Sequence, residues 1–406
     1  MSRLSHFVRG AAVAALVGAA ASCAGPDHNL VTLPTVGGGL FTSYVALGNS
    51  LTAGYQSGGI NDSTQRQSFA VLLAHQMGTR FAYPSLVNPG CPPPLTNFAT
   101  GARVTPKGYP ASTDATCFLR DPASATDVLN NVAVPGANSA DPTGGPGSAA
   151  NALTTFVLGG LTQAQRALVA KPTFATIWIG NNDILAYALN GTPQFATPQA
   201  TFVSNYNAMM TQLMAGAPTL KGVLMGVVQV ALAPQLFPAA ALANPQFVAG
   251  LSVAVGKQVL VHPDCLAGPG AQSLINIQIV SALRTAPVPM IVCAKGDVPG
   301  AGDVGILDVD EQAFVQNTVN GYNAYIKAKA DSLGWAYWDP NTVLTQLKAT
   351  GAVSTVPNLA SSTAPFGTAI SLDGVHPSAS GHIAIANALI QTINAKFNTS
   401  IPAISQ

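Results

Sequence analysis

Charged side chains are scarce in this chain. Asp, Glu, Lys and Arg together make up 8% of the 406 residues, and the formal net charge at pH 7 is +1. A chain with so little charge excludes the electrostatic attraction on which nucleic-acid-binding proteins and proteins of anionic surfaces depend. Hydrophobic residues reach 48%, and the 30 prolines and 39 glycines imply many turns. This composition is typical of a secreted globular enzyme.

Sets of metal ligands are also lacking. None of His28, His75, His262 and His382 combines with a cysteine or a carboxylate at a spacing typical of a metal site. The stretch 297–308 contains Gly and Asp but lacks the pattern of an EF-hand. We therefore expect a protein that works without a catalytic metal and without another cofactor.

The apolar run near the N-terminus is short. It covers residues 11–21, follows Arg3 and Arg9, and is soon followed by Cys23. A run of this length cannot span a bilayer, and basic residues before a short apolar core are typical of a secretory signal peptide. Residues 20–23, Ala-Ala-Ser-Cys, further resemble a bacterial lipoprotein box, whose cysteine is acylated and becomes the mature N-terminus. The alternative is plain secretion with cleavage nearby.

These features predict how the N-terminal part is organised and where the protein resides. Residues 1–22 are expected to form a lipoprotein signal peptide. Residues 23–42 are polar and then Gly-rich without periodicity, as in a flexible tether. We expect the domain to be exported to the cell envelope and anchored to a membrane through the lipid on Cys23, with a periplasmic or secreted protein as the alternative.

Cysteine is rare, with five residues in all. If Cys23 carries a lipid, an even set of four remains in an oxidising compartment. Two local bridges then follow naturally, Cys91 with Cys117 and Cys265 with Cys293. Each would stabilise the fold by about 3 kcal/mol, because it limits the unfolded chain. The other two connectivities stay open on the sequence alone.

Short apolar runs alternate with helical patterns along the chain. The runs predict strands, and the stretches between them have the apolar period of helices. This alternation predicts an α/β fold, in which helices cover both faces of a parallel sheet. The expected strands are 44–47, 131–134, 174–179, 223–230 and 335–338, and the expected helices are 68–77, 149–168, 201–214, 312–332 and 378–397.

Residues with the chemistry of acyl transfer follow three of the expected strands. Ser50 comes just after 44–47, so its hydroxyl can project from the sheet edge while its own N–H points at a substrate oxygen. Asn182 stands just past 174–179 and offers side-chain N–H donors. Gly136 follows a proline and lacks a Cβ, so a substrate carbonyl can approach its N–H closely. These groups could together bind a developing oxyanion.

A base and an orienting group for it stand near the C-terminus. Asp373 and His376 are separated by two residues, one of them a glycine, so a tight loop can turn the carboxylate toward Nδ1 and leave Nε2 facing Ser50. Taken alone, each of these residues has an ordinary alternative as a turn serine, a turn glycine or a loop cap. Their combination in one chain favours a catalytic site.

The segments around these residues resemble the blocks of the SGNH (GDSL-type) hydrolase family. The resemblance spans about 44–397, and the matching segments, in chain order, are 46–54 (ALGNSLTAG), 131–137 (NVAVPGA), 180–183 (GNND) and 373–377 (DGVHP). It implies a flavodoxin-like three-layer α/β/α sandwich with a mostly parallel five-stranded sheet. It also implies a catalytic triad of Ser50, His376 and Asp373, and an oxyanion hole of Ser50, Gly136 and Asn182. One position departs, because Asn49 stands where the family has Asp, which removes a negative charge beside the nucleophile.

A single sheet must gather blocks spread so widely, so we expect one enlarged hydrolase domain over 43–398. Two long insertions, 84–127 and 231–305, do not fit the alternation of strands and helices. Loops of such length are functional or carry structure of their own, so we expect both to lie near the site and to shape its pocket. The second is apolar enough to form a lid, with a packed subdomain as the equal alternative.

The resemblance implies a carboxylic ester hydrolase that works through an acyl-enzyme. The family includes esterases, lipases and deacetylases of acetylated glycans. The apolar insertions slightly favour a substrate with an acyl chain. Two alternatives stay open: an O-acyltransferase that uses the same residues, and a surface binding lipoprotein with a degenerate hydrolase fold, which Asn49 alone favours. We expect a small-molecule, glycan or lipid ester as substrate, no nucleic-acid partner, and a monomer.

Overall fold

The computed structural model describes residues 36–117, 128–191, 193–293 and 305–405. The expected signal peptide, the lipidation site Cys23 and the tether up to residue 35 lie outside these ranges. In the described part, none of the helices combines the length and the apolar character that a membrane span requires.

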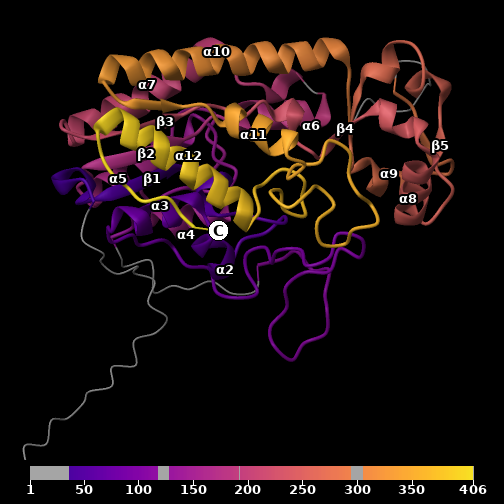
Figure 1. Ribbon diagram of the computed structural model, residues 1–406, viewed down its shortest axis with the longest axis horizontal. Coiled ribbons are helices and arrows are strands. Elements are labelled where there is room, and N and C mark those ends of the chain that lie inside the picture. The colour runs from indigo at the N-terminus through magenta and orange to yellow at the C-terminus, as the bar shows by residue number, and fades with distance from the viewer. Residues whose placement is uncertain (1–35, 118–127, 192, 294–304, 406) are drawn as a thin grey trace, which may run out of the picture.

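A sheet of four parallel strands forms the centre of the fold, in the order β1-β2-β3-β9 (Figure 1). Its register pairs Ala46 with Thr176, Thr176 with Val223, and Val223 with Ala336. All residues of β1 and β2 are buried, as expected for parallel strands that are covered on both faces. The strands are β1 (Tyr44–Gly48), β2 (Phe174–Trp178), β3 (Lys221–Met225) and β9 (Ala336–Trp338).

The expected fifth strand, 131–134, is not a strand of this sheet. An isolated parallel bridge joins Asn131 to Ala46, so the segment does run beside β1. At the next position, however, the Gly48 N–H donates to the side chain of Gln163 at 3.0 Å, and the Gln163 amide donates back to the Gly48 carbonyl at 3.0 Å. The Gly48 carbonyl still accepts from the Val134 N–H at 3.2 Å, but for the Gly48 N–H a side chain replaces the main-chain acceptor that a regular partner strand would supply. The prediction of five strands was therefore wrong.

Helices cover both faces of the sheet, which confirms the three-layer α/β/α architecture (Figure 1). Side chains alternate along β1: Tyr44 and Ala46 pack into the core with α3 (Phe69–Met77) and α12 (Ala379–Phe397). Val45 and Leu47 pack on the other face, with α5 (Gln163–Val169), α7 (Gln199–Gly216) and α10 (Val309–Leu333).

The remaining helices and strands are short and lie around these layers. The helix expected over 149–168 is two helices, because Gly159 and Gly160 both take positive φ, of 59° and 85°, which ends the first one. The helices are α1 (Ser50–Ala53), α2 (Asp62–Arg66), α4 (Ala152–Leu158), α6 (Asn182–Asn190), α8 (Pro245–Val255), α9 (Ile279–Thr285) and α11 (Pro340–Ala349), and the strands are β4 (Leu236–Pro238), β5 (Leu260–Val261), β6 (Leu274–Asn276), β7 (Met290–Ile291) and β8 (Ile306–Leu307).

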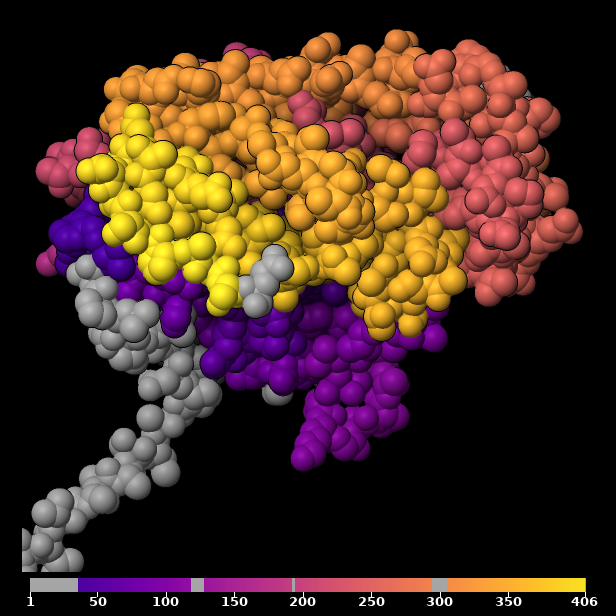
Figure 2. All heavy atoms as spheres, in the orientation of Figure 1, coloured from indigo at the N-terminus to yellow at the C-terminus, as the bar shows by residue number. Residues whose placement is uncertain are grey.

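The second insertion carries structure of its own. Its strands form the antiparallel sheet β4-β6-β8 and the parallel pair β5-β7. Phe237, Leu251 and Ile275 form an apolar core, which continues into Phe366 of the segment before the histidine. In Figure 2 the insertion (salmon) lies at one end of the molecule beside this segment (amber). The insertion therefore packs against the chain that leads to His376.

Each insertion also contains a disulfide bond. Cys91 is joined to Cys117, 26 residues apart, and Cys265 to Cys293, 28 residues apart. These are the two local pairs that the spacing of the cysteines favoured. Each bond links two distant points of its insertion and so restricts the unfolded chain.

Candidate active site

Ser50 lies at the point where β1 turns into α1. Its preceding residue, Asn49, is fully buried and caps the helix, because its Oδ1 accepts a hydrogen bond from the Leu51 N–H at 3.1 Å. An amide oxygen performs this capping as a carboxylate oxygen would. Asn49, which stands where the family has Asp, therefore keeps the cap of α1 and the local backbone geometry.

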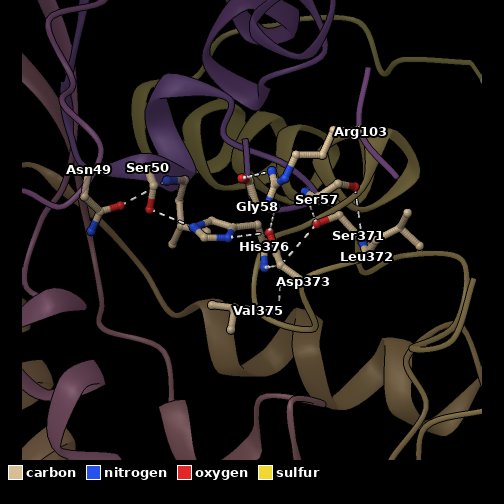
Figure 3. A network of polar contacts seen from close by, with 11 residues as sticks. Asn49, Ser50, Ser57, Gly58, Arg103, Ser371, Leu372, Asp373, Val375 and His376 are labelled. Carbon is tan, nitrogen blue, oxygen red and sulfur yellow. Dashed lines mark hydrogen bonds and ion pairs between the residues drawn. The ribbon is translucent and has the colours of Figure 1, made fainter. Parts of the chain in front are cut away.

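His376 and Asp373 meet Ser50 from the far end of the chain. The Nε2 atom of His376 lies 2.8 Å from Ser50 Oγ, and its Nδ1 atom lies 2.9 Å from Asp373 Oδ2 (Figure 3). Nδ1 carries the ring proton because it faces a carboxylate, so Nε2 accepts the hydrogen bond from the Ser50 hydroxyl. The side chains of His376 and Asp373 are only 14% and 16% exposed. The three groups thus form a continuous hydrogen-bonded chain that is largely shielded from water.

Asp373 is held as a carboxylate by a dense set of donors. Its Oδ1 accepts from the N–H groups of Val375 and His376 at 2.9 and 2.8 Å, and its Oδ2 from the Gly58 N–H at 2.7 Å. Burial alone raises the pKa of this carboxyl, but the adjacent His376 and the N–H donors outweigh burial and lower the pKa to about 2. Asp373 is therefore ionised throughout the neutral range.

A pair of serines joins the loop after Ser50 to the loop of Asp373 (Figure 3). The Ser57 N–H donates to Ser371 Oγ at 2.8 Å, and the Leu372 N–H donates to Ser57 Oγ at 3.2 Å. Arg103, from the first insertion, donates to the Gly58 carbonyl at 3.0 Å. These contacts hold in place the Gly58 N–H that donates to Asp373. The sequence contains no signal for them, because Ser57 and Ser371 are 314 residues apart.

Donors for an oxyanion gather beside Ser50. In the described part of the chain, the N–H groups of Ser50 and Gly136 have no hydrogen-bond acceptor, so both can serve a ligand. The Asn182 side chain donates to the Ala137 carbonyl at 2.8 Å, which places its amide against the loop of Gly136 and leaves its second N–H available. Gly136 has φ of +86°, a conformation that favours glycine.

A cavity of about 50 Å³ lies beside Ser50, Asn182 and His376. Ser50, Asn182 and His376 line it together with Asn181 and apolar side chains of the 228–233 segment. The arrangement has a hydroxyl that is hydrogen-bonded to an imidazole, a carboxylate that orients this imidazole, and N–H donors beside the hydroxyl. Such a set can carry out nucleophilic attack on a carbonyl carbon and bind the negative charge that develops on its oxygen.

The model of the GDSL-like lipase/acylhydrolase family matches residues 44–254, half of the chain. The chain belongs to this family. It is therefore an ester hydrolase, as the four sequence blocks predicted. The matched region includes Ser50, Gly136 and Asn182, whereas Asp373 and His376 lie beyond it.

Several solved structures are also similar to this hydrolase, at low sequence identity. A catalytic mutant of an acetylxylan esterase from Geobacillus stearothermophilus is 12% identical, with 87% of this chain and 94% of that chain covered and a TM-score of 0.38. The extracellular lipase of Streptomyces rimosus is 15% identical, with 86% and 99% covered and a TM-score of 0.31. No curated protein sequence is detectably similar. Scores this low carry no weight for the activity.

Asp183, the residue after Asn182, binds the loop that carries Gly136. Its buried carboxylate accepts hydrogen bonds from the N–H and the hydroxyl of Ser139, at 2.8 and 2.6 Å. These bonds tie the start of α6, which carries Asn182, to the loop that carries Gly136. Burial raises the pKa of Asp183 to about 6, although the bonds from Ser139 oppose this shift.

Burial of Asp183 predicts a dependence of stability on pH. Its pKa is about 6 in the folded protein and ordinarily 3.8, so between these values the folded state binds more protons than the unfolded state. The free energy of unfolding should therefore fall as pH rises from about 4 to about 6, by at most about 3 kcal/mol, and then level off. Asp183→Asn cannot titrate, so urea denaturation should show the wild-type stability declining relative to this variant over that range.

Asp331→Asn serves as the control for this measurement, because its exposed carboxylate pairs with Lys327 on the surface of α10. The difference in free energy of unfolding between the wild type and Asp331→Asn should change little over the same pH range. If the free energies of unfolding of the wild type and of Asp183→Asn differed by a constant amount from about pH 4 to pH 6, the raised pKa of Asp183 would be contradicted.

Tyr55 is a further neighbour of the site that sequence reasoning missed. Its ring centroid lies 4.8 Å from that of His376. Burial and the charge of Asp373 raise the pKa of Tyr55 to about 12, although Arg103 lowers it. Tyr55 therefore stays neutral and restricts the imidazole by contact with its ring.

The described residues contain one group with potential metal ligands, Asp264 with Cys265 and Cys293. The two cysteines are joined in a disulfide, so neither offers the thiolate that a metal would bind. This group lies in the second insertion and does not belong to the Ser50 site.

Proposed function

We propose that this hydrolase cleaves carboxylic esters through an acyl-enzyme on Ser50. The observation that carries the proposal is the hydrogen-bonded chain from Ser50 Oγ through His376 to Asp373, with contacts of 2.8 and 2.9 Å. In this proposal Ser50 is the nucleophile, His376 the base, and Asp373 the group that orients the base. The N–H groups of Ser50 and Gly136 and the Asn182 amide form the oxyanion hole.

The reaction would proceed in two symmetrical halves. Ser50 Oγ attacks the ester carbonyl carbon while its proton passes to His376 Nε2, and the carbonyl oxygen becomes an anion bound by the three donors. The intermediate then expels the alcohol, which takes the proton from Nε2, and the acyl group stays on Ser50. Water attacks the acyl-enzyme while the same Nε2 takes its proton. The second intermediate then expels Ser50 Oγ, which takes this proton back from Nε2, and the acid leaves. Asp373 stabilises the imidazolium in both halves without taking its proton.

The test of this proposal is the hydrolysis of p-nitrophenyl acetate by the full chain and by Ser50→Ala. We expect turnover by the first and its loss in the second, because the variant lacks the attacking oxygen. Unchanged turnover in Ser50→Ala would remove Ser50 as the nucleophile.

We further propose that the enzyme is exported and anchored to a cell-envelope membrane through Cys23. The short apolar run at 11–21, the basic residues before it and the Ala-Ala-Ser-Cys sequence support this location. Mass spectrometry of the mature protein from a bacterial membrane fraction should find a new N-terminus at Cys23 that carries acyl chains. The Cys23→Ser variant should no longer be found in the membrane fraction. An intact, unacylated N-terminus in the wild type would contradict the anchor.

A further inference from the structure

A second hollow, entirely apolar, lies next to the catalytic cavity. Its volume is about 70 Å³, and no lining residue carries a charged, hydroxyl, carboxyl or amide side chain. Its lining residues come from α11, α12 and the ends of β2 and β9. The helices α11 and α12 are neighbours (Figure 1). Its walls include Trp178, Trp338, Val343, Leu344, Leu347 and Ile385.

This hollow adjoins the cavity of Ser50 directly. Leu51, Val228 and Val375 line both spaces and so form a wall that the two share. Leu51 follows the nucleophile and Val375 precedes the base in sequence. A group that extends from a carbonyl carbon at Ser50 would enter the hollow by displacing side chains of this shared wall.

The chemistry of the walls decides which part of an ester fits there. A sugar ring would lose hydrogen bonds to water and find no hydroxyl, amide or charged side chain to replace them, which is costly. A hydrocarbon chain loses nothing, and each buried methylene is favourable. We propose that this hollow is a subsite for the acyl chain of the ester, so that the enzyme prefers aliphatic acyl esters over acetyl esters. The proposal rests on Ser50 being the nucleophile.

A third cavity, beside the second insertion, has a different character and does not suit this role. It encloses about 310 Å³ between the second insertion and α10, and its walls include Gln229, Gln312, Gln316 and Lys348 beside Leu274. It shares no residue with the cavity of Ser50. Its half-buried Leu274 therefore offers a matched control for the half-buried Leu344 of the acyl subsite.

The test is the dependence of kcat/KM on acyl length, measured with p-nitrophenyl acetate, butyrate, hexanoate, octanoate and decanoate. For the wild type we expect kcat/KM to rise by up to about fourfold for each methylene that the subsite buries, and then to level off. Leu344→Trp should fill the subsite and abolish this rise, so that kcat/KM for the longer esters falls toward that for the acetate. Leu344→Ala should move the preference toward longer chains, and Leu274→Trp should keep the wild-type profile.

Two measurements distinguish a failure of the acyl subsite from a failure of Ser50 as the nucleophile. If Leu344→Trp and Leu344→Ala both hydrolyse the acetate normally and keep the wild-type length profile, the subsite is overturned and Ser50 as nucleophile is not. Binding is measured without turnover in Ser50→Ala, where octanoate should change the tryptophan fluorescence, because two of the three tryptophans line the subsite. Octanoate without effect on this fluorescence would also overturn the subsite, whatever the esterase assay shows.

Discussion

Ser50→Ala is expected to lower kcat for p-nitrophenyl acetate by about 10⁴-fold or more. Removal of the nucleophile from a serine triad leaves only binding and the oxyanion donors, and these account for a small part of the catalysis. In this enzyme the loss should be large, because His376 Nε2 makes its hydrogen bond to Ser50 Oγ at 2.8 Å and would have no other nucleophile in place. Release of p-nitrophenolate, followed by its absorbance, measures the effect.

Ser332→Ala is the control for this variant, because it makes the same change on the exposed surface of α10, away from the site. It should retain turnover within about twofold of the wild type. The thermal midpoint of Ser50→Ala should stay close to that of the wild type, since the substitution removes one half-buried hydroxyl. A variant that is folded and active at the wild-type rate would refute the role of Ser50.

Asp373→Asn is expected to lower kcat by about 10³- to 10⁴-fold, the second large effect. An amide in place of the carboxylate favours the wrong tautomer of the histidine and no longer stabilises the imidazolium. The geometry of this site strengthens the expectation, because Oδ2 accepts from both Gly58 N–H and His376 Nδ1, and an amide NH₂ at that position cannot accept from either. The steady-state kcat for p-nitrophenyl acetate at neutral pH and above measures the loss.

Asp339→Asn provides a matched comparison for this variant. Asp339 also accepts a hydrogen bond from a backbone N–H, that of Asn341 at 3.0 Å, but it caps α11 and touches no imidazole. Its replacement should keep kcat within about twofold. If Asp373→Asn also retained kcat within tenfold while it stayed folded, Asp373 would serve as a loop cap and not as the orienting group of His376.

The chemical groups of the site could be predicted from the sequence because each stands in a short segment. Ser50 and Asn182 follow apolar runs that end in glycine, and Asp373 and His376 are three positions apart. Such signals are local, so they survive in a sequence without coordinates. The α/β class was predictable for the same reason, because alternation can be counted along the chain. The spacing of the cysteines favoured the two local disulfide pairs but left the other two connectivities open.

The features that the sequence did not reveal all depend on contacts between distant residues. The segment 131–134 is apolar like a strand, yet Gln163 takes the place of a main-chain partner on Gly48, 115 residues away. Asp183 suits a helix cap by its position, and only the fold shows that it binds Ser139. In each case a side chain competes with a local pattern, and which side chain arrives is decided by packing.

The sequence by itself determined which reactive groups this hydrolase has, the order in which they occur, and the kind of strand that precedes the nucleophile. The tertiary structure alone decided that Ser50, Asp373 and His376 share one hydrogen-bonded chain, that Ser57 and Ser371 join their loops, and that an apolar hollow adjoins the nucleophile. The physical reason is range. Strand propensity and block spacing act over a few residues, whereas hydrogen bonds and hollows form between segments that meet only when the sheet assembles.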